Sequence, residues 1–172
     1  MATLCDTRLS WRHRTPVRPT ACMSILILRS VHAATPLPSS SRPAFERPLR
    51  ERARTAGQSL QCRAFNSVRD LLAGLQRARQ ERPDMLLLDT GDLVLQDSTQ
   101  AKALRDALDD LPSPYIEVHD YAAHALEPWE RQQHTPLVTV ILRDDLPRAY
   151  AMALDIALRR LDRAPAADTF HA

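Results

Sequence analysis

Asp84-Met85-Leu86-Leu87-Leu88, near the middle of a chain of 172 residues, ends in four consecutive apolar residues. Consecutive apolar residues without polar alternation indicate a β-strand that is buried on both faces, as strands of parallel sheets are. A second stretch of this kind, Ser24-Ile25-Leu26-Ile27-Leu28, lies nearer the start of the chain. Strands buried on both faces need helices on each side of their sheet. The two stretches therefore predict an α/β fold.

The sequence around these stretches alternates between strands and helices. Further strands are expected at residues 59–64, 115–119 and 136–142, and helices at residues 49–56, 68–80, 101–111 and 147–161. In the second helix, for example, Val68, Leu71, Leu72 and Leu75 recur at helical spacing. Such alternation implies a parallel sheet with right-handed crossovers. We expect a flavodoxin-like three-layer sandwich whose five-stranded parallel sheet has the order 2-1-3-4-5.

One domain accounts for most of the chain. We expect it to span residues 23–163, with Met23 as a plausible true start and residues 164–172 as a loose tail. Residues 1–22 hold four arginines and a single acid, Asp6. We interpret them as a disordered or wrongly assigned extension, with a basic arm or a targeting peptide as the alternative. The segment lacks the apolar stretch of a secretory signal.

Composition excludes several classes of function. Hydrophobic residues make up 44% of the chain, and the formal net charge is only +2. These values suit a globular domain and give no indication of a nucleic-acid or membrane partner. The cysteines are Cys5, Cys22 and Cys62; their number is odd and no C-x-x-C spacing occurs, which argues against a disulfide framework or a zinc site. We expect a cytoplasmic location and no metal or other cofactor.

The topology itself locates a candidate site. Ligands of such sheets bind beyond the carboxyl ends of the strands, near the point where the strand order reverses. This rule brings together residues 29–45 after the first strand, residues 89–97 after the third and residues 119–131 after the fourth.

Two short motifs carry a resemblance to a known family. Leu104-Arg105-Asp106-Ala107-Leu108 is followed, eight residues later, by Glu117-Val118-His119. The same two motifs at the same spacing occur in type II 3-dehydroquinate dehydratases, and this chain resembles that family from about residue 23 to residue 161. Gly91 also falls on the glycine of the family's N-P-G-A motif, and Asn66 on the asparagine of its Q-S-N motif.

The resemblance implies the family's reaction, the removal of water from 3-dehydroquinate in the shikimate or quinate pathway. In the family, a lid tyrosine beside an arginine takes a proton alpha to the ketone, and the histidine of E-V-H donates one to the leaving hydroxyl. A carboxylate two residues from a histidine on a strand points to the same face. Glu117 is therefore expected to orient His119 and to favour its protonated form, and Arg42 to be the arginine of the lid. A histidine that merely satisfies a strand end is the alternative for His119.

Other residues match the substrate-binding positions of the family. We assign substrate contacts to Asp89, Asp120, Tyr121 and Arg131. The resemblance also implies that Asp106 reaches the substrate of a neighbouring subunit. The partners expected are therefore a small anionic cyclic acid and further copies of this chain, in a trimer or a dodecamer. A solvated surface arginine is the alternative for Arg42 and Arg131.

The departures from the family concern its base and its neutral amides. Phe45 stands where the lid tyrosine should be, and Asp89 replaces the asparagine of N-P-G-A. The first loop, N-G-P-N-L-N in the family, begins here with Arg29-Ser30. Loss of a general base costs about 10²- to 10⁴-fold in rate. We therefore expect a divergent dehydratase that is weak or inactive, or alternatively a non-catalytic binding or regulatory homologue.

A receiver domain of the response-regulator type was the rival within the same fold. The stretch that ends in Asp89 resembles the strand that carries the phosphate acceptor of such receivers. Receivers also need an acidic pair after the first strand and a lysine after the fifth. Here those strands end in Arg29-Ser30 and Leu142-Arg143, and the interpretation fails on both counts.

Overall fold

The structure is a computed structural model that describes residues 24–30, 46–91, 98–120 and 133–163. Strands and helices alternate within these ranges. They are β1 (Ser24–Ser30), α1 (Glu46–Thr55), β2 (Ser59–Phe65), α2 (Val68–Glu81), β3 (Met85–Asp89), α3 (Ser98–Asp109), β4 (Tyr115–His119), β5 (Thr139–Ile141) and α4 (Leu146–Arg163). The strands form one parallel sheet in the order β2-β1-β3-β4-β5, which confirms the predicted topology.

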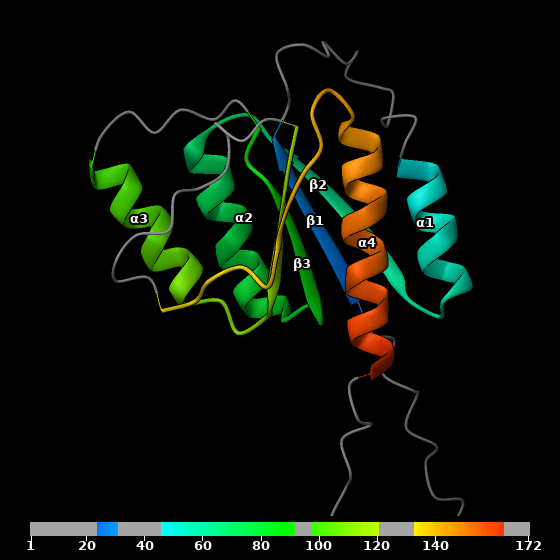
Figure 1. Ribbon diagram of the computed structural model, residues 1–172. Coiled ribbons are helices and arrows are strands. Elements are labelled where there is room, and N and C mark those ends of the chain that lie inside the picture. Colours follow the sequence, from blue (N-terminus) through cyan, green and yellow to red (C-terminus); the bar gives the residue numbers. More distant parts are fainter. Residues whose placement is uncertain (1–23, 31–45, 92–97, 121–132, 164–172) are drawn as a thin grey trace, which may run out of the picture.

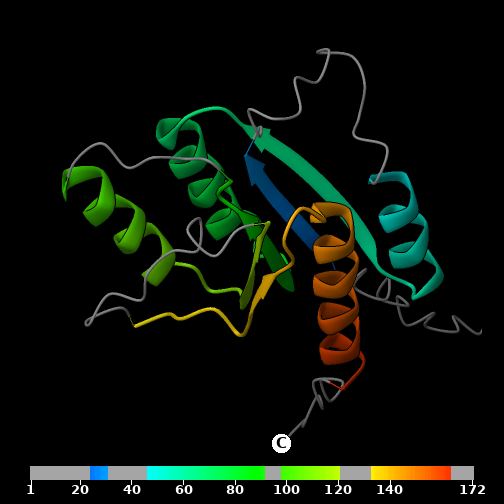
Figure 2. The same cartoon turned by 45° about the horizontal axis from the view of Figure 1, so that its top comes forward.

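The helices cover the two faces of the sheet in pairs. α1 and α4 lie on one face, while α2 and α3 lie on the other (Figure 1). The same division is seen after rotation, with α4 running alongside the central strands (Figure 2). The three-layer sandwich expected from the sequence is therefore present.

Alternate residues of the central strands feed two separate cores. Ile25 and Ile27 of β1 join the α1–α4 side, whereas Leu26 and Leu28 join the α2–α3 side. Each of these four side chains is at most 3% exposed. This double burial is why the strands show no polar alternation in the sequence.

Local signals explain where the helices begin and end. Ser67 caps α2, its hydroxyl accepting a hydrogen bond from the backbone N–H of Asp70 at 3.1 Å. Gly57 follows α1 with φ +73°, a backbone conformation that glycine adopts without strain. α1 begins three residues earlier than expected, because Pro48 falls within its first turn, where no intrahelical N–H bond is needed.

The fifth strand is shorter than its sequence suggested. β5 spans only Thr139–Ile141, whereas residues 136–142 were expected to be extended. Backbone bonds to β4 nevertheless continue on either side, from Leu137 N–H to the Tyr115 carbonyl at 2.8 Å and from Leu142 N–H to the His119 carbonyl at 3.1 Å. Pro136, which has no N–H to donate, lies just before the first of these bonds.

No helix in the described part of the chain has the length and hydropathy that a bilayer crossing requires.

Candidate active site at the carboxyl end of the sheet

The carboxyl end of β4 places a carboxylate and an imidazole side by side. Ile116 and Val118 point into the core beneath α4, so that Glu117 and His119 point to the opposite face of the strand. Glu117 is 2% exposed and His119 is 0% exposed. Groups of this kind are rarely buried without a partner, which makes their contacts informative.

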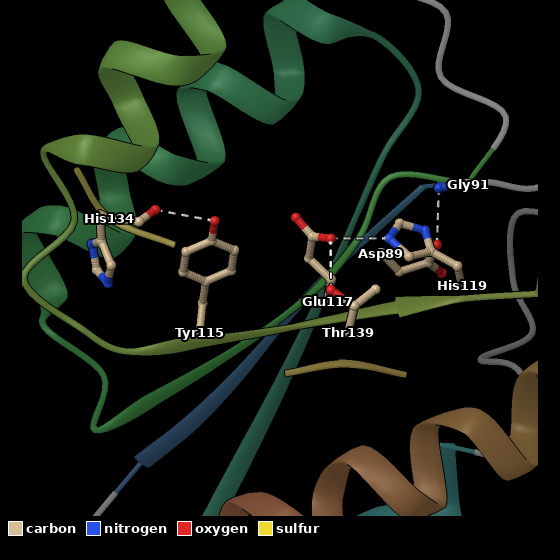
Figure 3. Close-up of polar contacts among 7 residues, drawn as sticks. All are labelled: Asp89, Gly91, Tyr115, Glu117, His119, His134 and Thr139. Atoms are coloured by element: carbon tan, nitrogen blue, oxygen red, sulfur yellow. Dashed lines mark hydrogen bonds and ion pairs between the residues drawn. The ribbon is translucent and has the colours of Figure 1, made fainter. Parts of the chain in front are cut away.

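The two ring nitrogens of the buried His119 differ in their contacts. His119 Nε2 lies 3.5 Å from Glu117 Oε2 (Figure 3). His119 Nδ1 is buried and has no hydrogen-bond partner among the described residues. An N–H at Nε2 that donates to Glu117 fixes the tautomer of the neutral ring and leaves Nδ1 for another group. The expected orienting role of Glu117 therefore has a geometric basis.

The end of β3 carries a second buried carboxylate. Tyr150 of α4 donates its hydroxyl to Asp89 Oδ2 at 2.6 Å. The backbone N–H of Gly91 donates to Asp89 Oδ1 at 2.9 Å (Figure 3). Gly91 has φ +51°, which lets the chain turn back over the carboxylate. Asp89 is thus fixed in place from α4 and from its own turn.

A buried arginine lies on the neighbouring strand. Arg29 of β1 is the register partner of Asp89, and the two are 4% and 0% exposed. Residues opposite one another in a parallel pair point to the same face, which here is the α1–α4 side. The negative charge of Asp89 therefore has a positive charge across from it on β1.

Tyr150 is held as a neutral phenol. Complete burial raises its pKa well above the ordinary value for tyrosine, and the neighbouring charge of Asp89 raises it further. A phenol of this kind donates a hydrogen bond and is not available as a phenolate base.

Cys62 does not supply a nucleophile. Burial, followed by the adjacent Glu46, raises the pKa of its thiol to about 12. Because the thiolate is the reactive form, Cys62 is inert at neutral pH. Its side chain packs against the α1–α4 core, as expected for a small apolar residue on a strand. Among the described residues, no cluster of histidine, cysteine and carboxylate side chains could hold a metal ion.

The structure brings some of the predicted site residues together and leaves others apart. Glu117 and His119 lie together at the carboxyl end of β4 on the α2–α3 face of the sheet, whereas Asp89 lies at the end of β3 on the α1–α4 face. Asp120 follows β4 directly. Asp106 lies on the exposed surface of α3, where Lys102 Nζ contacts its Oδ2 at 2.5 Å. The remaining candidates, Arg42, Tyr121 and Arg131, lie outside the described residues, as does Phe45.

Three further polar residues lie in this region and carry no role predicted from the sequence. They are Arg29, Tyr150 and Thr139. A usable signal exists for Tyr150, because the first turns of a helix that follows a parallel strand lie beside the carboxyl ends of the strands. For Thr139, the sequence gives no such signal, and its position beside Glu117 follows only from the register of β4 and β5.

Comparison with known proteins gives consistent results in sequence and in structure. The family model described as "Dehydroquinase class II" matches residues 39–158. The 3-dehydroquinate dehydratase of Alkalilimnicola ehrlichii is 33% identical over 122 residues, covering 70% of this chain and 78% of that protein. That of Thioalkalivibrio sulfidiphilus is 32% identical over 111 residues, covering 64% of this chain and 73% of the relative.

Solved structures match the fold at lower identity. A type II dehydroquinase from Propionibacterium acnes has a TM-score of 0.56 and 21% identity, covering 80% of this chain and 98% of its own. A 3-dehydroquinate dehydratase-like protein from Bifidobacterium longum has a TM-score of 0.58 and 15% identity, covering 81% and 98%. At these identities the structures support the shared fold, while the sequence matches carry the relationship.

Proposed function

The chain belongs to the class II dehydroquinase family, and on that basis we propose that it eliminates water from 3-dehydroquinate to give 3-dehydroshikimate, at a rate well below that of a member with a complete site. The proposal has two halves. One concerns the acid that serves the leaving hydroxyl, and the other concerns the base that takes the proton alpha to the ketone.

The acid half rests on one observation, the buried Nδ1 of His119. Its ring contacts Glu117 through Nε2, and Nδ1 has no partner among the described residues. Burying a polar atom without a hydrogen-bond partner costs free energy, and a bound ligand can supply the missing partner. In its protonated form, the ring carries an N–H at Nδ1 that can be delivered to a departing hydroxyl. We assign His119 as the general acid and Glu117 as the group that orients it.

The base half lacks a suitable phenol. Phe45 stands at the position of the family's lid tyrosine and has no ionisable group. Tyr150 does not substitute for it, because burial raises its pKa and its hydroxyl already donates to Asp89. Tyr115 is also completely buried, with its hydroxyl 3.3 Å from the carbonyl oxygen of His134. Slow turnover is the consequence, since a general base contributes about 10²- to 10⁴-fold in rate.

A second candidate function is the binding of a small acid without turnover. The observation that favours it is the opposite charge of Arg29 and Asp89, which are register partners and stand where the family has neutral amides at its strand ends. Two charged side chains in place of neutral amides change which ligands the site binds, and they do not add a general base. Under this alternative the chain is a binding or regulatory homologue.

The proposal also includes the bounds of the functional unit, its location in the cell and its assembly. We place the functional unit at residues 23–163 and expect it in the cytoplasm as a homo-oligomer, a trimer or a dodecamer. Asp106 supports the assembly, because its exposed position on α3 makes functional sense beside another subunit.

The test is to follow 3-dehydroshikimate by its absorbance while the full chain and two variants act on 3-dehydroquinate. We expect slow formation by the unaltered chain, loss of activity in His119→Ala and a fall of about tenfold or more in Glu117→Gln. Activity that persists unchanged in His119→Ala would overturn the assignment of the acid. Binding of 3-dehydroquinate without any product would favour the second candidate.

A further inference from the structure

The carboxylate that contacts His119 has a second contact, on the edge strand. Thr139 Oγ1 lies 3.3 Å from Glu117 Oε2 (Figure 3). This is the same oxygen that lies 3.5 Å from His119 Nε2. A hydroxyl can only donate to an ionised carboxylate, so this oxygen can accept one hydrogen from Thr139 and another from His119 when Nε2 carries the proton. The chain of contacts runs from β5 through Glu117 to the imidazole.

The backbone of β5 holds the same two residues. Glu117 is the register partner of Thr139, and His119 is the register partner of Ile141. The Glu117 N–H donates to the Val138 carbonyl at 3.1 Å, and the His119 carbonyl accepts from Leu142 N–H at 3.1 Å. β5 therefore restrains the backbone of both residues, and Thr139 adds a restraint on a side chain.

A side-chain restraint matters here because the contact between Glu117 and His119 is long. At 3.5 Å, it lies at the outer limit of a hydrogen bond and does not by itself fix the carboxylate. Glu117 has three rotatable bonds, and a second donor narrows its choice of rotamer. The residues two positions before and after Thr139 are apolar, namely Leu137 and Ile141. They cannot provide that donor.

We propose that Thr139 is a positioning residue, whose hydroxyl holds Glu117 Oε2 against His119 Nε2 and so keeps Nδ1 as the nitrogen that faces the ligand. The consequence for turnover rests on the proposed dehydratase function. The consequence for the imidazole does not, because it concerns the tautomer and order of His119 in the protein without ligand. Thr139 acts through Glu117 and does not itself touch the reacting atoms.

The test compares three variants of the full chain. Thr139→Val removes the hydroxyl while keeping the size and β-branching that suit a strand. Thr139→Ser keeps the hydroxyl and removes a methyl group. Leu137→Val is the matched control, since it trims a half-exposed residue two positions before Thr139 that also bonds to β4 through its backbone.

The first measurement is the imidazole ¹⁵N spectrum of His119, assigned by the loss of its signals in His119→Gln. At a pH where the ring is neutral, the unaltered chain, Thr139→Ser and Leu137→Val should show one tautomer, protonated at Nε2. Thr139→Val should shift towards a mixture of tautomers. An unchanged spectrum in Thr139→Val would overturn the proposal, whatever the activity.

The second measurement separates the two steady-state constants. Thr139→Val should lower kcat about tenfold and leave KM within about twofold, because a hydrogen bond to a charged group is lost without a substrate contact. Thr139→Ser should recover most of kcat, and Leu137→Val should match the unaltered chain. A fall in Thr139→Ser equal to that in Thr139→Val would refute the role of the hydroxyl. An unaltered chain that gives no product would refute the proposed function, and the spectra alone would then decide the role of Thr139.

Discussion

At the scale of single residues, the site is defined by polar groups that burial has forced into pairs. His119 has Glu117, and Asp89 has the hydroxyl of Tyr150 and the N–H of Gly91. Burial without these partners would cost several kcal/mol for each charged group, at the order-of-magnitude level. The paired arrangement is stable, but it also ties up the phenol that could have served as a base.

The missing base leads to a prediction for Phe45→Tyr. This change restores a phenol at the position of the lid tyrosine, beside Arg42 in the sequence. We expect turnover of 3-dehydroquinate to rise at least about tenfold, while remaining below that of an intact relative, because Arg29 and Asp89 still replace neutral amides. The steady-state rate of product formation measures it. The matched control, Phe65→Tyr, changes a buried residue of β2 and should bring no gain. No gain in Phe45→Tyr would contradict the placement of Phe45 at the position of the lid tyrosine. Full activity in the unaltered chain would point to another base, with Tyr121 the first to mutate.

The Tyr150 hydroxyl leads to a prediction for stability. Tyr150→Phe leaves Asp89 Oδ2 buried without its shortest hydrogen bond, and we expect a loss of about 1.5–3 kcal/mol in the free energy of unfolding. Urea denaturation followed by circular dichroism measures the change. Tyr115→Phe serves as a comparison, since the contact of its hydroxyl with the neutral carbonyl of His134 is longer, at 3.3 Å, and its loss should cost less. Equal losses in the two variants would contradict this account of Asp89.

At the scale of elements, the sequence predicted the positions of the buried strands and helices. It did not predict features that depend on which strands pair with one another. Continuous apolar runs located β1 and β3, and helical spacing located α2, since both patterns reflect which faces are covered. The length of β5 and the contact of Thr139 with Glu117 depend on how β5 pairs with β4. No local sequence pattern indicates the register of that pairing. Arg29 and Asp89 are likewise distant in sequence and meet only through register.

The start of β1 leads to a prediction about residues 1–22. The Ser24 N–H donates to Asp84 Oδ2 at 2.6 Å, and the Ser24 carbonyl accepts from the Asp84 N–H at 2.9 Å. These contacts secure the first strand at its first residue. A variant that begins at Met23 should therefore melt within about 2 °C of the full chain, since surface changes away from the fold have small effects on stability. Calorimetry on both proteins measures this. A fall of many degrees would make the extension part of the fold.

At the scale of the whole molecule, the position of Asp106 bears on how subunits are expected to assemble. Asp106 lies on the exposed surface of α3 and pairs with Lys102 of the same helix, apart from the buried Glu117 and His119. In our proposal, the carboxylate completes the site of a neighbouring subunit. Function then depends on assembly as well as on the fold of one chain.

Assembly leads to a prediction for the mass of the particle in solution. We expect light scattering at micromolar concentration to give at least a trimer, that is, three chains of 19.4 kDa each. Asp106→Ala should lower activity without changing that mass, because the residue is exposed on its helix and contributes little to folding. A monomer at this concentration would remove the role assigned to Asp106.

In our proposal, the acid at His119 remains while the base is missing. The kcat/KM of the unaltered chain for 3-dehydroquinate should be measured beside that of the Alkalilimnicola ehrlichii relative under the same conditions. We expect a value lower by about 10²- to 10⁴-fold, the contribution of one general base. A value equal to that of the relative would contradict it, because a complete acid and base would then have to be present.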